Sequence, residues 1–144
     1  ISFQLLYGGL PKEFLEIPFF NKVNTFIFKF WEEWKLKNHY KTYLYNRKVY
    51  QATIGKMNPQ KLFNYYIQSA ETELNSEAME RVISVLKEYN SKFILYTYDS
   101  FTFDFDLSEG KELIVKIKDA MKYPTRIGFG SNYGDLKDVS YKFS

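Results

Sequence analysis

The sequence predicts an α+β fold in which antiparallel hairpins form a sheet and long helices pack on one face of it. Apolar residues recur every three or four positions over residues 19–37 and 58–89, which is typical of amphipathic helices. Apolar and polar residues instead alternate over 93–105, and a second strand-like run covers 41–51. Because helices and hairpins follow one another along the chain, we expect antiparallel strands with the helices collected on one side.

Composition limits the chemistry that the chain can perform. It has 144 residues, 20% of them aromatic, and no cysteine, which excludes disulfides and thiolate metal sites. No apolar run approaches membrane-spanning length and no signal peptide is visible, so we expect a cytoplasmic protein without a membrane partner. Because the chain begins at Ile1, without an initiator methionine, we expect it to be a piece of a longer protein.

Positive charge is concentrated in one segment. Residues 22–61 carry nine Lys or Arg against two Glu, interleaved with Tyr, Phe and Trp, whereas residues 71–144 carry ten basic and thirteen acidic residues. Such a segment is typical of a surface that meets a phosphate backbone. The alternative is a solvated helix face along which the lysine stems lie.

The first elements are expected to be helical. Residues 1–7 are predicted to end a helix that Gly8-Gly9 closes, and residues 11–18, bracketed by prolines, have room for one or two helical turns. The next helix, over 19–37, should bury a stripe that consists of Phe20, Val23, Ile27, Phe30 and Trp34.

A hairpin over 41–51, with Asn46-Arg47 at its turn, precedes the strongest helix signal of the chain. Asn58 suits the N-cap of that helix and Pro59 suits its first position, and the pattern extends to Tyr89. The apolar residues of this helix step by four along one side: Leu62, Tyr66, Ala70, Leu74, Ala78, Val82 and Leu86.

The stretch FILYTYDSFTFDF, residues 93–105, is predicted to form two half-buried strands joined by a very tight turn. Strict alternation places Leu95 and Thr97 on one face of the first strand, and Ile94 and Tyr96 on the other. Asp99-Ser100 allows two interpretations: both residues suit turns and are simply the turn, or the turn holds a carboxylate out over a groove.

The remaining elements are a helix and a strand. Asp106 and Glu109 have the spacing of a capping box, which predicts a helix that ends near Lys122. Residues 126–130 are expected to form the last strand, before an exit segment rich in Gly, Ser, Asn and Asp.

Four stretches, in their order and spacing, resemble the C-terminal end of family A (polymerase I-like) DNA polymerases. They are ISFQLLYGG, like the end of the fingers helix; NYYIQSAETEL, like the Asn-x₃-Gln stretch of a long palm helix; LYTYDSF, like the palm hairpin; and IGFGSNYGDL, like the closing Gly-x-Gly-x-Asn-aromatic stretch. The resemblance implies that residues 1–40 are the end of the fingers and the helices that follow, and that 41–144 belong to the palm. The short segment between Tyr7-Gly8 and Pro18 resembles trimmed, phage-like forms, which implies a phage-encoded enzyme in a bacterial host.

The resemblance also implies the contacts with the substrates, dNTPs and primer–template DNA. Phe3 and Tyr7, four residues apart on one helix face, would close over the incoming nucleotide, with Tyr7 among the catalytic residues and Gly8 leaving room for the backbone to turn. Asn64 and Gln68 share a helix face and would contact the minor groove, where hydrogen-bond acceptors are common to all base pairs. We expect Arg47, from the basic segment, to contact DNA as well.

Asp99 takes the place of the second catalytic aspartate. The resemblance implies two Mg²⁺ ions, held by Asp99 together with an upstream aspartate from the remaining N-terminal part of the polymerase. Carboxylate oxygens suit such hard cations. Family A enzymes usually have His-Asp-Glu at this turn. Here Tyr98 takes the histidine position, from which its hydroxyl can donate toward the primer terminus, and Ser100 takes the glutamate position.

Three alternatives stay open. Single-subunit phage-type RNA polymerases often have Asp-Ser-Phe in their palm hairpin, as residues 99–101 do here, although IQSAETEL and GFGSNYG favour the DNA polymerases. A non-catalytic nucleic-acid-binding module would use the basic segment 22–61 and would not need Asp99. A plain α+β interaction domain would need none of these features.

Overall fold

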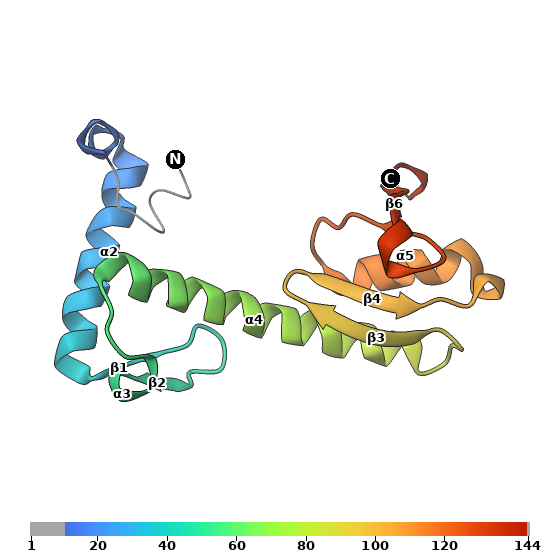
Figure 1. The fold of residues 1–144 in the computed structure, drawn as a ribbon, viewed down its shortest axis with the longest axis horizontal. Coiled ribbons are helices and arrows are strands. Elements are labelled where there is room, and N and C mark those ends of the chain that lie inside the picture. The colour runs from blue at the N-terminus through green and yellow to red at the C-terminus, as the bar shows by residue number, and fades with distance from the viewer. Residues whose placement is uncertain (1–10, 144) are drawn as a thin grey trace. The chain divides into compact units, whose positions relative to one another are not determined.

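The computed structural model describes residues 11–143 and confirms the α+β class (Figure 1). The chain divides into two compact units, residues 1–74 and 75–144. The subdomain boundary predicted between residues 40 and 41 falls inside the first strand, β1 (His39–Lys41). In the described part of the chain, each of three hairpins forms its own two-stranded antiparallel sheet.

Unit 1 is built on a helix with the predicted buried stripe. Pro18 occupies the start of this helix, where its missing N–H costs nothing, and Asn38 ends it in the left-handed conformation with φ 57°. Ile27 and Trp34 are buried, and with Tyr40, Leu62 and Phe63 they form the core of the unit. The elements are η1 (Lys12–Glu16), α2 (Pro18–Lys37), β1, β2 (Lys48–Tyr50), α3 (Gln51–Ile54) and the first part of α4 (Pro59–Leu86).

The first hairpin does not turn at Asn46-Arg47 as predicted. β1 and β2 pair over three residues each, and a loop over 42–47 joins them, closed by a hydrogen bond from the Thr42 N–H to the Arg47 carbonyl, 2.9 Å. The backbone N–H groups of Leu44 and Tyr45 both point at the Glu73 carboxylate. The loop is therefore shaped by a buried anion on α4, which the turn-forming residues alone do not reveal.

Helix α4 is a single helix of 28 residues that contributes buried side chains to the cores of both units. It ends at Leu86, three residues before the predicted end at Tyr89. A step of four residues rotates by about 40° beyond a full turn, so the apolar stripe winds around the helix. Its start, Leu62, is buried in unit 1, and its end, Val82 and Leu86, is buried in unit 2.

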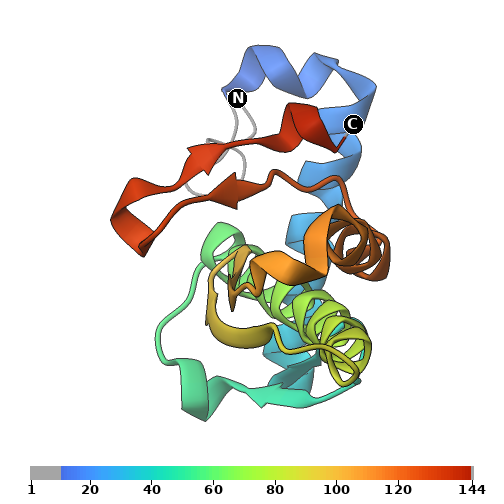
Figure 2. The same ribbon diagram turned by 90° about the vertical axis from the view of Figure 1, so that its right-hand side faces the viewer.

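The described part of unit 2 contains two hairpins, two α-helical segments and three short 3₁₀ turns. Its elements are the second part of α4, β3 (Lys92–Thr97), β4 (Ser100–Asp104), η2 (Leu107–Glu109), α5 (Gly110–Met121), β5 (Gly128–Phe129), η3 (Tyr133–Asp135), β6 (Lys137–Asp138) and η4 (Ser140–Lys142). The expected exit segment is in fact the second arm of a hairpin, because β6 pairs with β5 (Figure 2).

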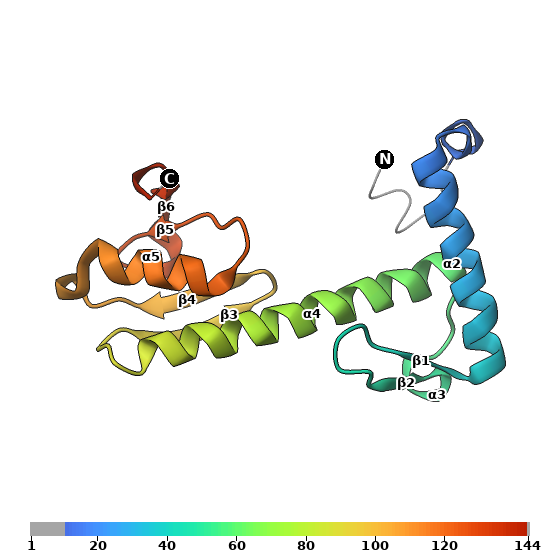
Figure 3. The ribbon, with the colours of Figure 1, turned by 180° about the vertical axis from the view of Figure 1, so that it is seen from behind.

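The helices of unit 2 lie on one face of the β3–β4 hairpin, as predicted. The hairpin is in front of α4 and α5 in Figure 1, and both helices are in front of it when the molecule is seen from behind in Figure 3. Val82 and Leu86 from α4 and Leu113 and Ile117 from α5 form the buried cluster. The aromatic side chains that pack against this cluster from the hairpin side are Phe93, Phe101, Phe103 and Phe105.

Strict alternation along β3 is wrong, because a bulge interrupts it. Phe93 pairs with Phe103 and Leu95 with Thr102, so Ile94 has no partner. The extra residue brings Phe93 and Tyr96 to the same face, where both rings contact Phe101 edge-on at 5.5 Å. Ile94 and Leu95 are left exposed.

Asp106 and Glu109 do not form the predicted reciprocal capping box. The Asp106 carboxylate accepts from the Ser108 N–H at 2.9 Å, but α5 begins only at Gly110, after the short η2 turn. Glu109 reaches across instead and accepts from the backbone N–H groups of Asn90 and Ser91. The Ser91 hydroxyl accepts from the Asp106 N–H at 2.9 Å, so it takes the place that the capping box assigns to the glutamate.

Candidate functional site

The structure brings two of the predicted site residues into one turn. Tyr98 and Asp99 form the two-residue connection between β3 and β4, since Thr97 pairs directly with Ser100. The turn predicted at Asp99-Ser100 is therefore shifted by one residue, and Ser100 opens β4.

The backbone of this turn is strained. Tyr98 has φ 53°, in the left-handed region that bulky side chains rarely adopt. Primed hairpin turns require a positive φ at the first central position, because this matches the twist of the strands. The Tyr98 side chain is 88% exposed, so no burial of its ring compensates for the strain. Strain of this kind is typical of functional sites.

Four contacts hold the turn in place. The Asn75 side-chain amide, on α4, donates to the Tyr98 carbonyl at 3.3 Å and to the Tyr96 hydroxyl at 3.2 Å. The Ser100 hydroxyl donates to the Thr97 carbonyl at 3.0 Å, across the turn. Below the turn, the ring of Phe101 lies edge-on against that of Tyr96, on strands that are packed on the unit 2 core. Asp99 is thus presented at the tip of a braced hairpin.

Asp99 is one exposed carboxylate and supplies one ligand position. Residues 11–143 contain no group of three or more His, Cys, Asp or Glu side chains that could together hold a metal ion. A carboxylate at this tip has the right oxygen chemistry for Mg²⁺, which also needs further oxygen ligands. Asp99 is therefore the ligand that the described residues would contribute to the predicted site.

The predicted DNA-binding residues of unit 1 lie on α4 and on the first hairpin. Gln68 is exposed and Asn64 is half-buried, one turn apart on α4. Arg47 donates through Nε to the Glu73 carboxylate at 3.0 Å, while its side chain stays 61% exposed. The contact of Asn64 and Gln68 with the minor groove stays a prediction. Phe3, Tyr7 and Gly8 lie outside the described residues.

Sequence reasoning missed Glu73, the most completely buried acid that the structure describes. Its side chain is fully buried, and its carboxylate accepts from the N–H groups of Leu44, at 2.9 Å, and Tyr45, at 3.3 Å, besides Arg47. Glu73 lies seven residues after Tyr66, so it falls on the apolar stripe of α4. The signal that could have identified Glu73 is its spacing, because an acid seven residues after a buried residue of a helix lies on the same, buried face.

The pKa of Glu73 is lowered by the donors around it. Burial raises the pKa of this carboxyl, but hydrogen bonds from the Thr42 hydroxyl, the two loop N–H groups and Arg47 outweigh that effect. Glu73 is therefore ionised at neutral pH and binds the loop as an anion.

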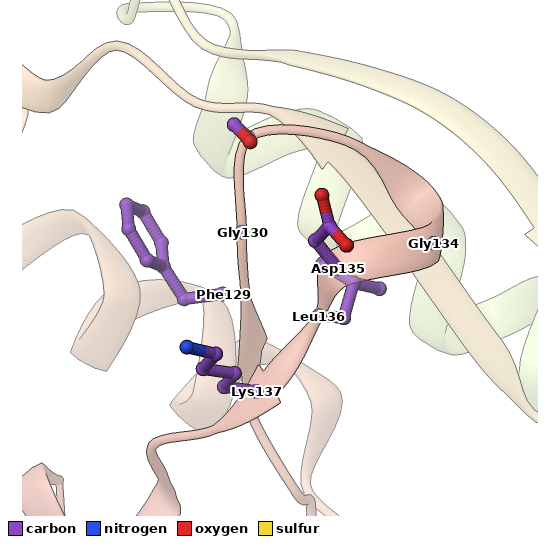
Figure 4. A pocket seen from close by; sticks show the side chains of 7 residues that line it. Phe129, Gly130, Gly134, Asp135, Leu136 and Lys137 are labelled. Carbon is purple, nitrogen blue, oxygen red and sulfur yellow. The ribbon is translucent and has the colours of Figure 1, made fainter.

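A shallow cavity lies inside the β5–β6 hairpin (Figure 4). Gly130 faces the backbone there: a Cβ at this position would lie 2.7 Å from the Asp135 carbonyl oxygen, so the loop closes only around a glycine. Asp135 accepts from the Asn132 amide at 2.6 Å. In the stretch GFGSNYG, Asn132 and Gly130 therefore make contacts that shape the loop between β5 and β6.

No known protein family, curated protein or solved structure matches this chain. Among the described helices, none is both long enough and apolar enough to cross a membrane.

Proposed function

We propose that this chain contributes the metal-binding turn of a template-directed DNA polymerase of the family A type. The observation that carries the proposal is the Tyr98-Asp99 turn, an exposed carboxylate at the tip of a braced and strained two-residue hairpin. The resemblance of the surrounding sequence motifs supports the choice of family, and the carboxylate at the turn suits the metal chemistry.

The proposed reaction is nucleotidyl transfer from a dNTP to the 3′ end of a primer. Such transfers need little covalent help from the protein and depend on positioning and on charge neutralisation. Two Mg²⁺ ions supply that charge and activate the primer hydroxyl when they are bound. Asp99 would hold one side of this site, and an aspartate from another part of the polymerase would hold the other.

Neighbouring residues have supporting roles in the proposal. Tyr98 is well exposed beside Asp99, and in this proposal its hydroxyl would donate toward the primer terminus. Asn64 and Gln68 would contact the minor groove of the primer–template, and Phe3, Tyr7 and Gly8 the incoming dNTP.

The test is Asp99→Asn in the longest natural protein that contains this chain. The change is nearly isosteric and asparagine suits the turn, so folding and DNA binding should persist. Loss of the charge should lower the rate of nucleotide incorporation about a thousandfold or more. Ser100→Ala, which removes only the bond to the Thr97 carbonyl, is the matched control and should have a far smaller effect.

Two outcomes of this test argue against the proposal. If Asp99→Asn and Ser100→Ala reduce the rate equally, or if Asp99→Asn mainly lowers the melting temperature, Asp99 is a turn residue only. Preference for ribonucleotides over dNTPs would instead support the RNA polymerase alternative suggested by Asp99-Ser100-Phe101.

The 144 residues alone are expected to incorporate no nucleotide, because one carboxylate cannot hold two ions. Primer extension by the purified chain, measured beside its Asp99→Asn variant to exclude a contaminating enzyme, checks this expectation. Extension that depends on Asp99 would show that the chain contains a complete site.

A further inference from the structure

The outward face of the β1–β2 sheet displays two lysines and two rings. Lys41 lies directly opposite Lys48, and His39 lies opposite Tyr50. Because side chains of a strand alternate between faces, these four residues share one face. The other face carries Tyr40, which is 4% exposed and packs in the core of unit 1.

The lysine pair is unfavourable for the fold. Like charges directly opposite each other on antiparallel strands destabilise the pairing. In the part of the chain that the structure describes, no carboxylate lies within ion-pair distance of Lys41 or Lys48. By contrast, Lys35 and Lys37 on α2 are paired with Glu32 and Glu33.

The surrounding sequence contains no acid that could relieve this charge. From residue 34 to residue 70 there are seven Lys or Arg and no Asp or Glu. Glu73 is the acid that reaches the hairpin, and it is buried beneath the loop and already bonded to Arg47. The outward face is therefore complementary to an anion that the described residues do not provide.

Aromatic rings lie beside these charges. Tyr50 is 49% exposed, with its ring 5.5 Å from that of His39, and Tyr43 on the adjoining loop is 63% exposed. The Arg47 guanidinium lies over the ring of Tyr45, with 6.0 Å between the guanidinium carbon and the ring centroid. Exposed rings offer faces on which unpaired bases stack, and a duplex keeps its base faces covered.

We propose that the outward face of the β1–β2 sheet, with the loop over 42–47, binds a single-stranded polynucleotide. Lys41, Lys48 and Arg47 contact its phosphates, and Tyr43 and Tyr50 stack on its bases. Glu73 fixes the shape of the loop from below. This surface lies within unit 1, does not depend on Asp99, and goes beyond the proposed catalytic turn.

The experiment measures binding of a labelled oligothymidylate to the full 144-residue chain over a range of salt concentrations. Each phosphate contact on a single strand contributes about 0.7 to the slope of log affinity against log salt. The double variant Lys41→Gln/Lys48→Gln should therefore lower the slope by about 1.4. Lys87→Gln/Lys111→Gln, which removes the same charge from exposed positions in unit 2, should leave the slope unchanged.

Stacking is tested separately from charge. Tyr43→Leu should weaken binding about tenfold at fixed salt and leave the slope unchanged, because it removes one stacking platform and no charge. Tyr123→Leu is the matched control, since Tyr123 is an exposed tyrosine of unit 2 and its loss should not alter binding. Asp99→Asn should bind as the wild type does, so the outcome for this surface is independent of the catalytic proposal.

A stability measurement adds a result that a merely structural role would not give. Removal of the opposed lysines should raise the melting temperature by about 1–3 °C while affinity falls. The proposal is overturned if both lysine double variants lower the slope equally, or if a duplex of the same length binds as tightly as the single strand. Equal binding of poly-glutamate would also overturn it, since the face would then select charge and not bases.

Discussion

The two main hairpins of the molecule both require a residue with positive φ near the turn, and they place different residues there. Each needs a backbone position in the left-handed region near its turn: Asn46 with φ 51° between β1 and β2, and Tyr98 with φ 53° between β3 and β4. Asparagine enters this region readily, because its short polar side chain bonds locally, whereas a bulky side chain does so at a cost of about 1–2 kcal/mol. The first hairpin has the residue that its fold favours, and the second does not.

Each hairpin contains one feature that is unfavourable for folding, and the two features lie in different places. An unfavourable residue at an exposed tip persists only when the surrounding structure holds it there. Asn75 and the aromatic strands hold the Tyr98 turn in place, so the strain is compatible with a role for Tyr98 and Asp99 beyond folding. In the first hairpin the unfavourable feature is instead the Lys41–Lys48 pair on the outward face.

The anchors of the two hairpins also differ in charge. Both come from α4: the buried Glu73 carboxylate binds the loop over 42–47, and the neutral Asn75 amide binds the Tyr98 turn. Hydrogen bonds to a charged group are about twice as strong as those between neutral groups. The first hairpin should therefore depend more on its anchor than the second.

Removal of the two anchors is expected to give the largest difference between the hairpins. Glu73→Ala leaves two backbone N–H groups and the Thr42 hydroxyl without their acceptor, and should lower the free energy of unfolding of unit 1 by about 2–4 kcal/mol. Asn75→Ala removes two neutral hydrogen bonds and should cost about 1 kcal/mol. Hydrogen exchange of the hairpin amides measures both effects, and equal losses of protection would contradict the comparison.

Lowering the pH should also destabilise the β1–β2 hairpin through its Glu73 anchor, with a smaller effect than removal of the anchor. Because the folded pKa of Glu73 is lowered, its stabilisation is fully present above its usual value near 4.5 and is lost as the pH falls through the lowered folded value. Glu73→Gln should remove this acid dependence from the β1–β2 hairpin. Protection of the Leu44 and Tyr45 amides, followed from neutral pH to below pH 4.5, is the measurement.

Unit 2 provides the internal control for the acid experiment. The pKa of Glu109 is also lowered: desolvation raises it, but hydrogen bonds from Ser91 and Asn90 outweigh that effect. The pKa of Asp106 is lowered by the Ser108 hydroxyl and N–H. Unit 2 should therefore lose stability in acid in both the wild type and Glu73→Gln. If Glu73→Gln abolishes the acid dependence of both units, the effect does not arise from the loop over 42–47.

The periodic parts of the fold could be predicted from the sequence, and the parts set by a single buried polar group could not. The stripes of α2 and α4 and the helix start at Pro59 follow from local pattern, and the structure has them, while α2 begins at Pro18, one residue before its predicted start. The loop over 42–47 depends on Glu73, 26 residues after Arg47, and the start of β3 depends on Glu109 in the same way. Local turn preferences carry no information about such distant acceptors.

Part of the candidate site could likewise be predicted from local sequence pattern, and part could not. A tight hairpin that presents Asp99 could be predicted from alternation on both sides of a polar pair. The position of the turn at Tyr98-Asp99 could not, because alternation does not distinguish a pairing of Thr97 with Ser100 from one of Tyr98 with Phe101. The observed pairing is what places Tyr98, and not Asp99, in the left-handed position.

Exchange of the two left-handed residues should have the smallest effect on stability and tests the comparison most directly. Tyr98→Asn puts a residue that tolerates positive φ at the tip and should stabilise unit 2 by about 1 kcal/mol, because the exposed ring contributes little packing. Asn46→Tyr should destabilise unit 1 by a similar amount. Thermal unfolding of both variants beside the wild type measures the two shifts.

In the longest natural protein that contains this chain, Tyr98→Asn should nevertheless slow nucleotide incorporation, because the hydroxyl beside Asp99 is lost. A variant that is more stable and less active would show that Tyr98 is kept for function at the expense of the turn. If Tyr98→Asn is instead less stable than the wild type, the ring contributes to the fold, and the contrast between the two hairpins does not hold.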